Sequence, residues 1–177
     1  KYPNATIDFM CYTNSVDVLI GNPNIDNVIV LPHKIRKSYI SLFKFIFDIR
    51  AKKYNVVIDV YNKLETNLIT LFSGAYTKIA YHKWYSSIFY THNLKRFDNT
   101  KETNYGLAIE NRLLLLEPLN LEKRTLNPFP KLFVSSKENE DTVALFEQYK
   151  IDRNAKVIMI SLLGSEQNKT YPLEYMA

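Results

Sequence analysis

Apolar residues along this chain fall into short groups that alternate between two kinds of spacing. Continuous apolar runs bounded by polar residues are typical of strands buried on both faces of a sheet. Such runs predict strands over residues 6–12, 27–31, 55–60, 76–81 and 156–163. Apolar residues at helical spacing predict helices over residues 15–20, 38–53, 65–72, 105–116 and 136–148. Because strands alternate with helices, we predict an α/β fold with a parallel, doubly wound sheet.

Several predicted helices carry residues suited to their ends. Ser38 and either Ser135 or Ser136 stand at helix starts, where a hydroxyl can accept a hydrogen bond from a backbone N–H of the first turn. Gly74 follows the helix 65–72, and glycine is favoured where a helix ends in a left-handed conformation. The stretch 82–96 shows neither period and is expected to be irregular.

A proline-containing stretch near 125–131 divides the predicted elements into two groups. Residues 131–177 hold one helix, one strand and the start of a helix, too little to bury a core alone. We therefore predict one domain over residues 1–130 and the beginning of a second α/β domain over residues 131–177.

The composition excludes several kinds of site. The chain has only four glycines, so neither the dinucleotide-binding fingerprint nor the P-loop pattern can be written in it. Its single cysteine, Cys11, lies in an apolar run and is interpreted as a buried hydrophobe. The three histidines are far apart, so neither a metal nor a cofactor is expected. No signal peptide or membrane-spanning run is evident, and a reducing, cytoplasmic compartment fits.

The formal charge of +5 is concentrated in one segment, residues 34–53. This segment holds seven basic residues and a single acid, Asp48. Such a local positive field favours phosphate-bearing partners: anionic lipid, phosphorylated glycan or nucleic acid. The helix 38–53 is apolar nearly all round, which is typical of a buried helix or, given its basic flanks, of one that lies on a membrane surface.

The segment after the last predicted strand is the most suggestive for chemistry. Lys169 lies between the strand that ends at residue 163 and a helix that begins at Tyr171-Pro172. Ligands bind at the carboxyl ends of parallel strands, and helix amino ends attract phosphate. Lys169 is therefore either a phosphate-binding cation or an exposed surface lysine.

Polar residues also follow two earlier strands. Asp59 lies inside an apolar strand, where a carboxylate is unfavourable unless it is paired, so it either caps the next helix or cross-links loops, or it faces a cleft. Residues 61–66 follow that strand and are either ligand-binding or an ordinary polar loop. His33 follows the strand 27–31 and could line the same cleft.

Five segments, taken in order, support a more specific interpretation. They are Tyr2-Pro3-Asn4-Ala5-Thr6-Ile7-Asp8, Gly21-Asn22-Pro23-Asn24-Ile25-Asp26-Asn27-Val28, Lys53-Tyr54-Asn55-Val56-Val57-Ile58-Asp59, Ser73-Gly74-Ala75 with Thr77-Lys78-Ile79-Ala80, and Lys169-Thr170-Tyr171-Pro172 with Glu174 and Ala177. Together they resemble the heptosyltransferases of glycosyltransferase family 9, which build the lipopolysaccharide core.

The resemblance implies two Rossmann-like domains that face each other across a cleft, the GT-B arrangement. Residues 1–130 would be the acceptor-side domain, and residues 131–177 the linker helix and first strand of the donor-binding domain. The implied reaction is an inverting transfer of a heptose-like sugar from an ADP-sugar to a lipopolysaccharide core or related glycolipid. It implies no metal. The enzyme is expected to be cytoplasmic, and the basic charge of residues 34–53 adds the expectation of a peripheral contact with the inner face of the inner membrane.

The resemblance also implies roles for particular residues. Lys169 would hold the donor diphosphate and stabilise its departure, which is an electrostatic catalytic role. The implied donor-binding residues are Gly164, Ser165, Lys169 and Tyr171. The implied acceptor-binding residues are His33, Lys34, Arg36, Tyr61, Asn62, Lys63 and Thr66.

The chain departs from the family pattern in several places. The family's first strand and the Gly-Asp loop with its catalytic base would precede Lys1, and most of the donor domain would follow Ala177. We therefore expect no transfer by these 177 residues alone. Tyr171 stands where the family usually has Trp, and Glu65 where a basic residue is common. The acceptor is therefore expected to differ from the familiar core.

Two other functions compete with this one. A non-catalytic basic α/β domain could dock on a membrane or a partner protein, and its function would then survive the loss of Lys169. A nucleic-acid-binding domain would fit the basic charge, but no recognised RNA- or DNA-binding pattern occurs, so nucleic acid is not an expected partner.

Overall fold

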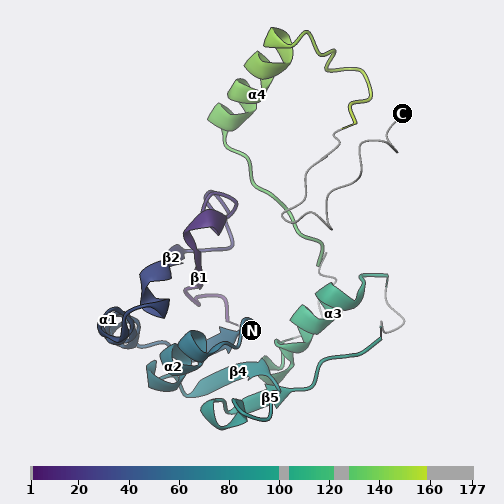
Figure 1. Cartoon of the computed structure of the whole chain (residues 1–177). Coiled ribbons are helices and arrows are strands. Elements are labelled where there is room, and N and C mark those ends of the chain that lie inside the picture. Colours follow the sequence, from purple (N-terminus) through teal and green to yellow (C-terminus); the bar gives the residue numbers. More distant parts are fainter. Residues whose placement is uncertain (1, 100–103, 122–127, 159–177) are drawn as a thin grey trace, which may run out of the picture. The chain divides into compact units, whose positions relative to one another are not determined.

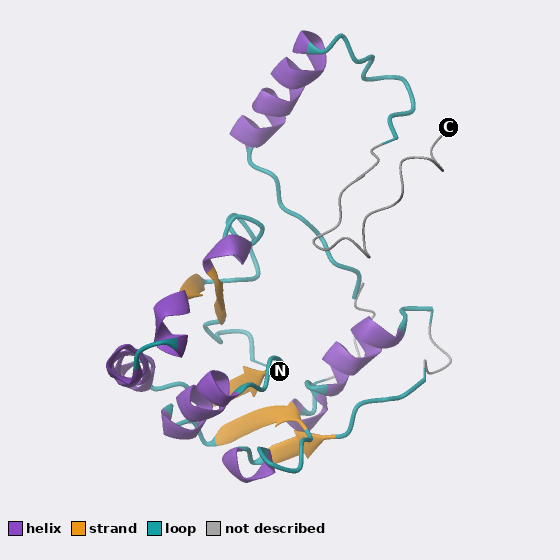
Figure 2. Cartoon of the chain, viewed as in Figure 1, coloured by secondary structure: helices purple, strands orange, loops and turns teal. Residues whose placement is uncertain are grey.

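The computed structural model describes residues 2–99, 104–121 and 128–158, and it divides into two compact units, Lys1–Phe133 and Val134–Ala177. Figures 1 and 2 show the elements of each unit. The predicted boundary after residue 130, and the assignment of the second unit to a donor-binding domain, stay predictions.

The first unit contains five strands and three α-helices among its described residues. The strands are β1 (Asp8–Tyr12), β2 (Asn27–Leu31), β3 (Val56–Asp59), β4 (Thr77–Tyr81) and β5 (His92–Leu94). The helices are α1 (Tyr39–Ala51), α2 (Leu64–Phe72) and α3 (Leu107–Leu114). Short 3₁₀ turns are η1 (Thr13–Ser15), η2 (His33–Arg36), η3 (Ser87–Phe89) and η4 (Glu117–Leu119). In the second unit the described residues form one helix, α4 (Ser136–Gln148).

The helix ends confirm the predicted caps. The Ser38 side chain accepts a hydrogen bond from the Ser41 N–H at 3.3 Å and so starts α1. Ser135 is the N-cap of α4, where it exchanges hydrogen bonds with Glu138. Gly74, at φ +80°, follows the end of α2 in the left-handed conformation that a side chain disfavours.

Three predicted elements differ in the structure. Residues 13–20 form η1 and turns instead of the predicted helix over 15–20. Few residues separate the end of β1 from Gly21 (φ +78°), and so short a helix does not offset its nucleation cost. The stretch expected to be irregular, 82–96, contains β5. Residues 156–158 are not a strand, and the rest of the strand predicted over 156–163 lies outside the described residues.

All described strand pairs are parallel, which confirms the predicted fold class. The strands form two sheets, β1-β2 and β3-β4-β5, instead of one continuous sheet. Side chains join β1 and β3 across the break at both ends. At the amino ends, the Tyr54 hydroxyl donates to the Asp8 carboxylate. At the carboxyl ends, the rings of Tyr12 and Tyr61 meet edge to face with centroids 6.1 Å apart. The edges of β1 and β3 therefore face each other and run in the same direction.

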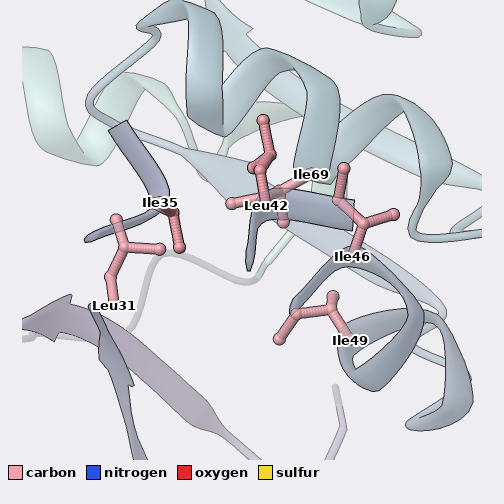
Figure 3. Packing of buried hydrophobic residues seen from close by; sticks show 6 residues of the cluster. All are labelled: Leu31, Ile35, Leu42, Ile46, Ile49 and Ile69. Carbon is pink, nitrogen blue, oxygen red and sulfur yellow. The ribbon is translucent and has the colours of Figure 1, made fainter. Parts of the chain in front are cut away.

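Two apolar clusters hold the helices against the strands. Figure 3 shows the first, in which α1 and α2 pack beside β2 and η2: Leu31, Ile35, Leu42, Ile46, Ile49 and Ile69. The second contains Ile79, Tyr81 and Leu115, and the Tyr81 hydroxyl donates to the backbone oxygen of Asn111 in α3. The sheets are therefore flanked by helices, as predicted.

Part of the β1-β2 sheet is less well covered. Its alternate side chains Met10 and Ile29 pack against the first cluster. On the other face, Phe9 and Val30 are 46% and 40% exposed. A parallel strand is usually buried on both faces, so this exposed apolar face is unusual for the fold.

Candidate functional site

Polar and aromatic side chains converge at the carboxyl ends of β1, β2 and β3. Tyr12 ends β1, His33 and Arg36 belong to η2 after β2, and Tyr61 and Glu65 follow β3. We call these five residues the tyrosine–arginine cluster. Because parallel strands end at one edge of a sheet, residues that are distant in sequence meet there, at the usual ligand-binding edge of an α/β fold.

Arg36 lies at the centre of the tyrosine–arginine cluster. Its Nε donates to Glu65 Oε1 at 2.8 Å in a salt bridge. Its Nη2 donates to the hydroxyl oxygens of Tyr12, at 2.7 Å, and Tyr61, at 2.8 Å. The Tyr12 hydroxyl in turn donates to Glu65 Oε1 at 3.2 Å. The guanidinium is thus held in one orientation by partners from β1 and from the segment after β3.

Aromatic contacts complete the cluster. The rings of Tyr12 and His33 stack with centroids 4.9 Å apart and an interplanar angle of 13°. The Arg36 guanidinium carbon lies 4.9 Å from the Tyr12 ring centroid, and Lys63 Nζ lies 5.2 Å from that of Tyr61. A cation over an aromatic face is attracted by the ring quadrupole. The arrangement joins flat apolar faces to fixed hydrogen-bonding groups, a combination suited to a sugar ring.

The charges in the cluster compensate one another. Burial raises the pKa of the Glu65 carboxyl, but hydrogen bonds from its own backbone N–H, from Arg36 and from Tyr12 outweigh burial and lower it below the ordinary value. Hydrogen bonds to Glu65 and Tyr61 raise the pKa of Arg36. Burial and the Glu65 charge raise the pKa of Tyr12. At neutral pH the cluster therefore holds an ionised Arg–Glu pair and a neutral Tyr12.

The cluster is open to solvent. The side chain of Arg36 is 42% exposed and that of Glu65 is 14% exposed. Tyr61 is 43% exposed, and His33 is also exposed. A ligand could therefore contact the rings of Tyr61 and His33 and Nη1 of the Arg36 guanidinium without displacing the core.

A buried network fixes the loop that carries Tyr61. Asp59, which is 6% exposed, accepts hydrogen bonds at Oδ1 from the backbone N–H groups of Tyr61 (2.9 Å) and Asn62 (2.7 Å). Its Oδ2 accepts from the Tyr90 hydroxyl at 2.7 Å. Of the two roles left open for Asp59, the structure therefore supports the cross-link between loops.

Asn62 and Thr66 belong to the same supporting framework. Asn62 has a left-handed backbone (φ 47°), donates to the Tyr81 carbonyl and accepts from Ser86. Thr66 Oγ1 accepts from the Lys63 N–H at 3.0 Å and so caps α2. Asn62 is 1% exposed and Thr66 is 4% exposed. Their side chains therefore position the loop, and their expected contact with an acceptor stays a prediction.

The remaining predicted site residues fall into two groups. Lys34 and Lys63 are exposed beside the cluster, where they could meet a ligand's negative groups. Gly164, Ser165, Lys169 and Tyr171 lie outside the described residues, so the predicted donor site stays a prediction.

Sequence reasoning missed the contribution of Tyr12, whose only signal was its place at the end of a strand, and that of Tyr90.

Among the described residues no group of three His, Cys, Asp or Glu side chains could hold a metal ion. Within that same part of the chain, none of the helices has the length and apolar character needed to span a bilayer.

The parallel sheets, flanked by helices, define a Rossmann-like α/β domain, and the cluster lies at its carboxyl edge. The sequence model described as glycosyltransferase family 9 (heptosyltransferase) matches residues 42–177, more than half of the chain. The chain therefore belongs to glycosyltransferase family 9.

Known proteins resemble the chain over part of their length. Lipopolysaccharide heptosyltransferase 3 of Escherichia coli is 26% identical over 138 residues, which cover 73% of this chain and 39% of that protein. The crystal structure of a family 9 glycosyl transferase from Veillonella parvula matches with a TM-score of 0.81 and 20% identity, over 98% of this chain and 49% of the other. E. coli ADP-heptose lps heptosyltransferase II matches with a TM-score of 0.58 and 20% identity, over 86% and 44%. The chain thus spans less than half of these relatives.

Proposed function

We propose that the chain is the acceptor-side part, with the start of the donor-side part, of an inverting glycosyltransferase. The proposed reaction transfers a heptose-like sugar from an ADP-sugar to a lipopolysaccharide core or related glycolipid. Family membership and the names of the relatives support the reaction class. The observation that carries the proposal is the solvent-open tyrosine–arginine cluster at the edge where α/β domains bind ligands.

In this proposal the cluster contacts the acceptor sugar. The exposed ring of Tyr61 offers an apolar face, and Nη1 of Arg36 offers donors to sugar hydroxyls. Lys34 and Lys63 lie beside them for acceptor phosphates. Because Arg36 is already paired with Glu65, its charge is less available to a phosphate than that of either lysine.

The donor side is proposed from the family resemblance alone. Lys169 would grip the diphosphate of the ADP-sugar, with Gly164 and Ser165 beside it and Tyr171 at the following helix start. No metal or cofactor is needed in this scheme, because a lysine can stabilise the departing diphosphate as a fixed charge.

The break between β1 and β3 supports a place for the family's first strand. One further parallel strand there would join the two sheets into a single one, and its carboxyl end would point to the same edge as Tyr12 and Tyr61. A catalytic base in the loop after that strand would then lie beside the proposed acceptor.

Acceptor kinetics in the full-length protein that carries this chain test the proposal. We expect Arg36→Ala and Tyr61→Ala each to raise the acceptor KM roughly tenfold, since each removes a contact of about 1.4 kcal/mol, and to leave the donor KM unchanged. Lys169→Ala should instead lower kcat by about a hundredfold or more.

Matched controls separate contact from general damage. Arg112→Ala and Tyr76→Ala make the same changes at exposed positions of the same unit that are not part of the tyrosine–arginine cluster, and they should leave both KM values unchanged. Circular dichroism should show that each variant is folded. An acceptor KM that is unaltered in both cluster variants would rule out the proposed acceptor site, and full function in Lys169→Ala would favour a non-catalytic docking domain.

A further inference from the structure

Helix α1 leaves a row of large apolar side chains on the surface. Tyr39, Ile40, Phe43 and Phe47 are 81%, 83%, 53% and 67% exposed, respectively. Tyr39, Phe43 and Phe47 are spaced four residues apart, so they share one side of the helix, and Ile40 borders them. We call these four residues the α1 stripe.

The α1 stripe is not the side of α1 that packs in the core. That side carries Leu42, Ile46 and Ile49, which are buried against α2 and β2, as Figure 3 shows. The helix is therefore already anchored, and its exposed aromatic side chains are not needed to hold it. Contiguous apolar surface of this kind marks an interaction site more often than a structural accident.

Basic side chains flank the α1 stripe without acidic partners. The salt bridges of the described residues in this segment use Arg36 and Lys52, with Glu65 and Asp8. Lys34, Lys37 and Lys44 are exposed, and within the described part of the chain none forms an ion pair. Asp48 is the only acidic residue between residues 34 and 53. The net charge of this segment is thus positive.

We propose that the α1 stripe docks this domain on an anionic lipid surface. Aromatic and aliphatic side chains would enter the boundary between headgroups and acyl chains, while the flanking lysines meet lipid phosphates. A partner protein would also cover apolar side chains, but the unpaired lysines before and within α1 are complementary to a surface of uniform negative charge.

The docked orientation has a consequence for the tyrosine–arginine cluster. A hollow lined by Ile35, Arg36, Lys37, Ser38 and Tyr39 runs from η2 to the start of α1. Arg36, a member of the tyrosine–arginine cluster, lies three residues before Tyr39, the first member of the α1 stripe. On a membrane, the cluster would be held at the level where the headgroup of a glycolipid is presented. The docking itself does not depend on the proposed transferase function.

Vesicle flotation of the 177-residue chain tests the proposal. The probes are vesicles of phosphatidylcholine alone and of phosphatidylcholine mixed with phosphatidylglycerol. We expect about tenfold or stronger partitioning onto the mixed vesicles, weakened by added salt. The double variant Phe43→Ser/Phe47→Ser should lose about tenfold or more of that binding, and Lys37→Ala/Lys44→Ala should lose about tenfold on mixed vesicles only.

Controls keep a negative result interpretable. Trp84→Ser/Ile88→Ser removes two apolar side chains elsewhere that are even more exposed, at 85% and 82%, and this variant should bind as the wild type does. In a Trp84→Phe background, Phe47→Trp places the single tryptophan in the stripe, and its emission should shift to the blue on mixed vesicles. This readout does not depend on loss of binding.

Three results would overturn the proposal. The first is wild-type binding by the folded Phe43→Ser/Phe47→Ser variant. The second is equal partitioning onto the two kinds of vesicle. The third is a wild-type dimer that the same double variant converts to monomer in size-exclusion chromatography, because a second copy of the chain would then be the occupant of the stripe.

Discussion

The buried Asp59 carboxylate depends on the hydroxyl of Tyr90, and Tyr90→Phe isolates that dependence. Tyr90 is 7% exposed, and its hydroxyl oxygen lies 2.7 Å from Asp59 Oδ2 and 2.6 Å from Asn67 Oδ1. Burial and the Asp59 charge raise the pKa of Tyr90 well above its ordinary value, so the phenol keeps its proton to donate. Within the described residues, no cation is paired with Asp59.

The size of the effect follows from what the substitution removes. Tyr90→Phe deletes one oxygen atom and leaves the ring in place. A hydrogen bond to a charged group contributes about 1.5–3 kcal/mol, and an unsatisfied buried acceptor is left behind. We expect the free energy of unfolding to fall by about 2 kcal/mol. For a unit of this size, that corresponds to a Tm lower by roughly 5–10 °C.

Thermal and urea unfolding followed by circular dichroism measure this loss. Tyr76→Phe deletes the same atom from a side chain that is 86% exposed and should change Tm by less than about 1 °C. A double-mutant cycle with Asp59→Asn should give a coupling energy of about 1 kcal/mol or more between the two side chains. If Tyr90→Phe melts within about 1 °C of the wild type, the hydroxyl is not what satisfies Asp59 and the reasoning fails.

Two further predictions concern charge. Burial raises the pKa of Asp8, but hydrogen bonds from Tyr54, Asn27 and Lys52 outweigh it and lower the pKa. The stability this gives is present above the ordinary value of 3.8 and is lost as pH falls through the folded-state value. Urea unfolding should therefore show that, from about pH 5 to about pH 2.5, the free energy of unfolding falls more steeply in the wild type than in Asp8→Asn. An equal pH dependence in the two proteins would contradict this prediction. Glu65→Gln removes the negative charge that compensates Arg36. The affinity of the domain for inorganic phosphate, measured by NMR titration, should therefore rise about threefold. An unchanged affinity would mean that the Arg36–Glu65 pair does not limit phosphate binding.

The best-predicted parts of the fold are those decided by close neighbours in sequence. The predicted strand 27–31 coincides with β2, and the predicted helix 38–53 contains α1, with Ser38 as its cap. Helical spacing and capping depend on residues within one turn of each other, so the local pattern contains the necessary information.

The missed elements depend on distant partners. Strand β5 has only three residues, His92-Asn93-Leu94, and none of the apolar run that signals a strand. It forms because the exposed edge of β4 supplies backbone partners, from Ile79 to Tyr81. The break between the two sheets likewise has no local signal, since it reflects which strand edges meet in space.

The candidate site divides in the same way. The strand-end pattern pointed to His33 and Tyr61 at one edge, and the family resemblance added Arg36. Which of them touch was decided by packing: Arg36 binds Glu65 across 29 residues of sequence and Tyr12 across 24. Because of these contacts, the positive charge of Arg36 is neutralised by Glu65, whereas the sequence had led us to expect a site of net positive charge.

By itself the sequence determined the α/β class, the position of most helices and strands, and the edge at which polar residues gather, because these follow from periodicity and end signals within a few residues. Only the tertiary structure decided which of these polar side chains hold the loops in place and which are exposed to solvent. Asp59 meets Tyr90 across 31 residues and Tyr54 meets Asp8 across 46, pairings that exist only once the helices have packed the strands together.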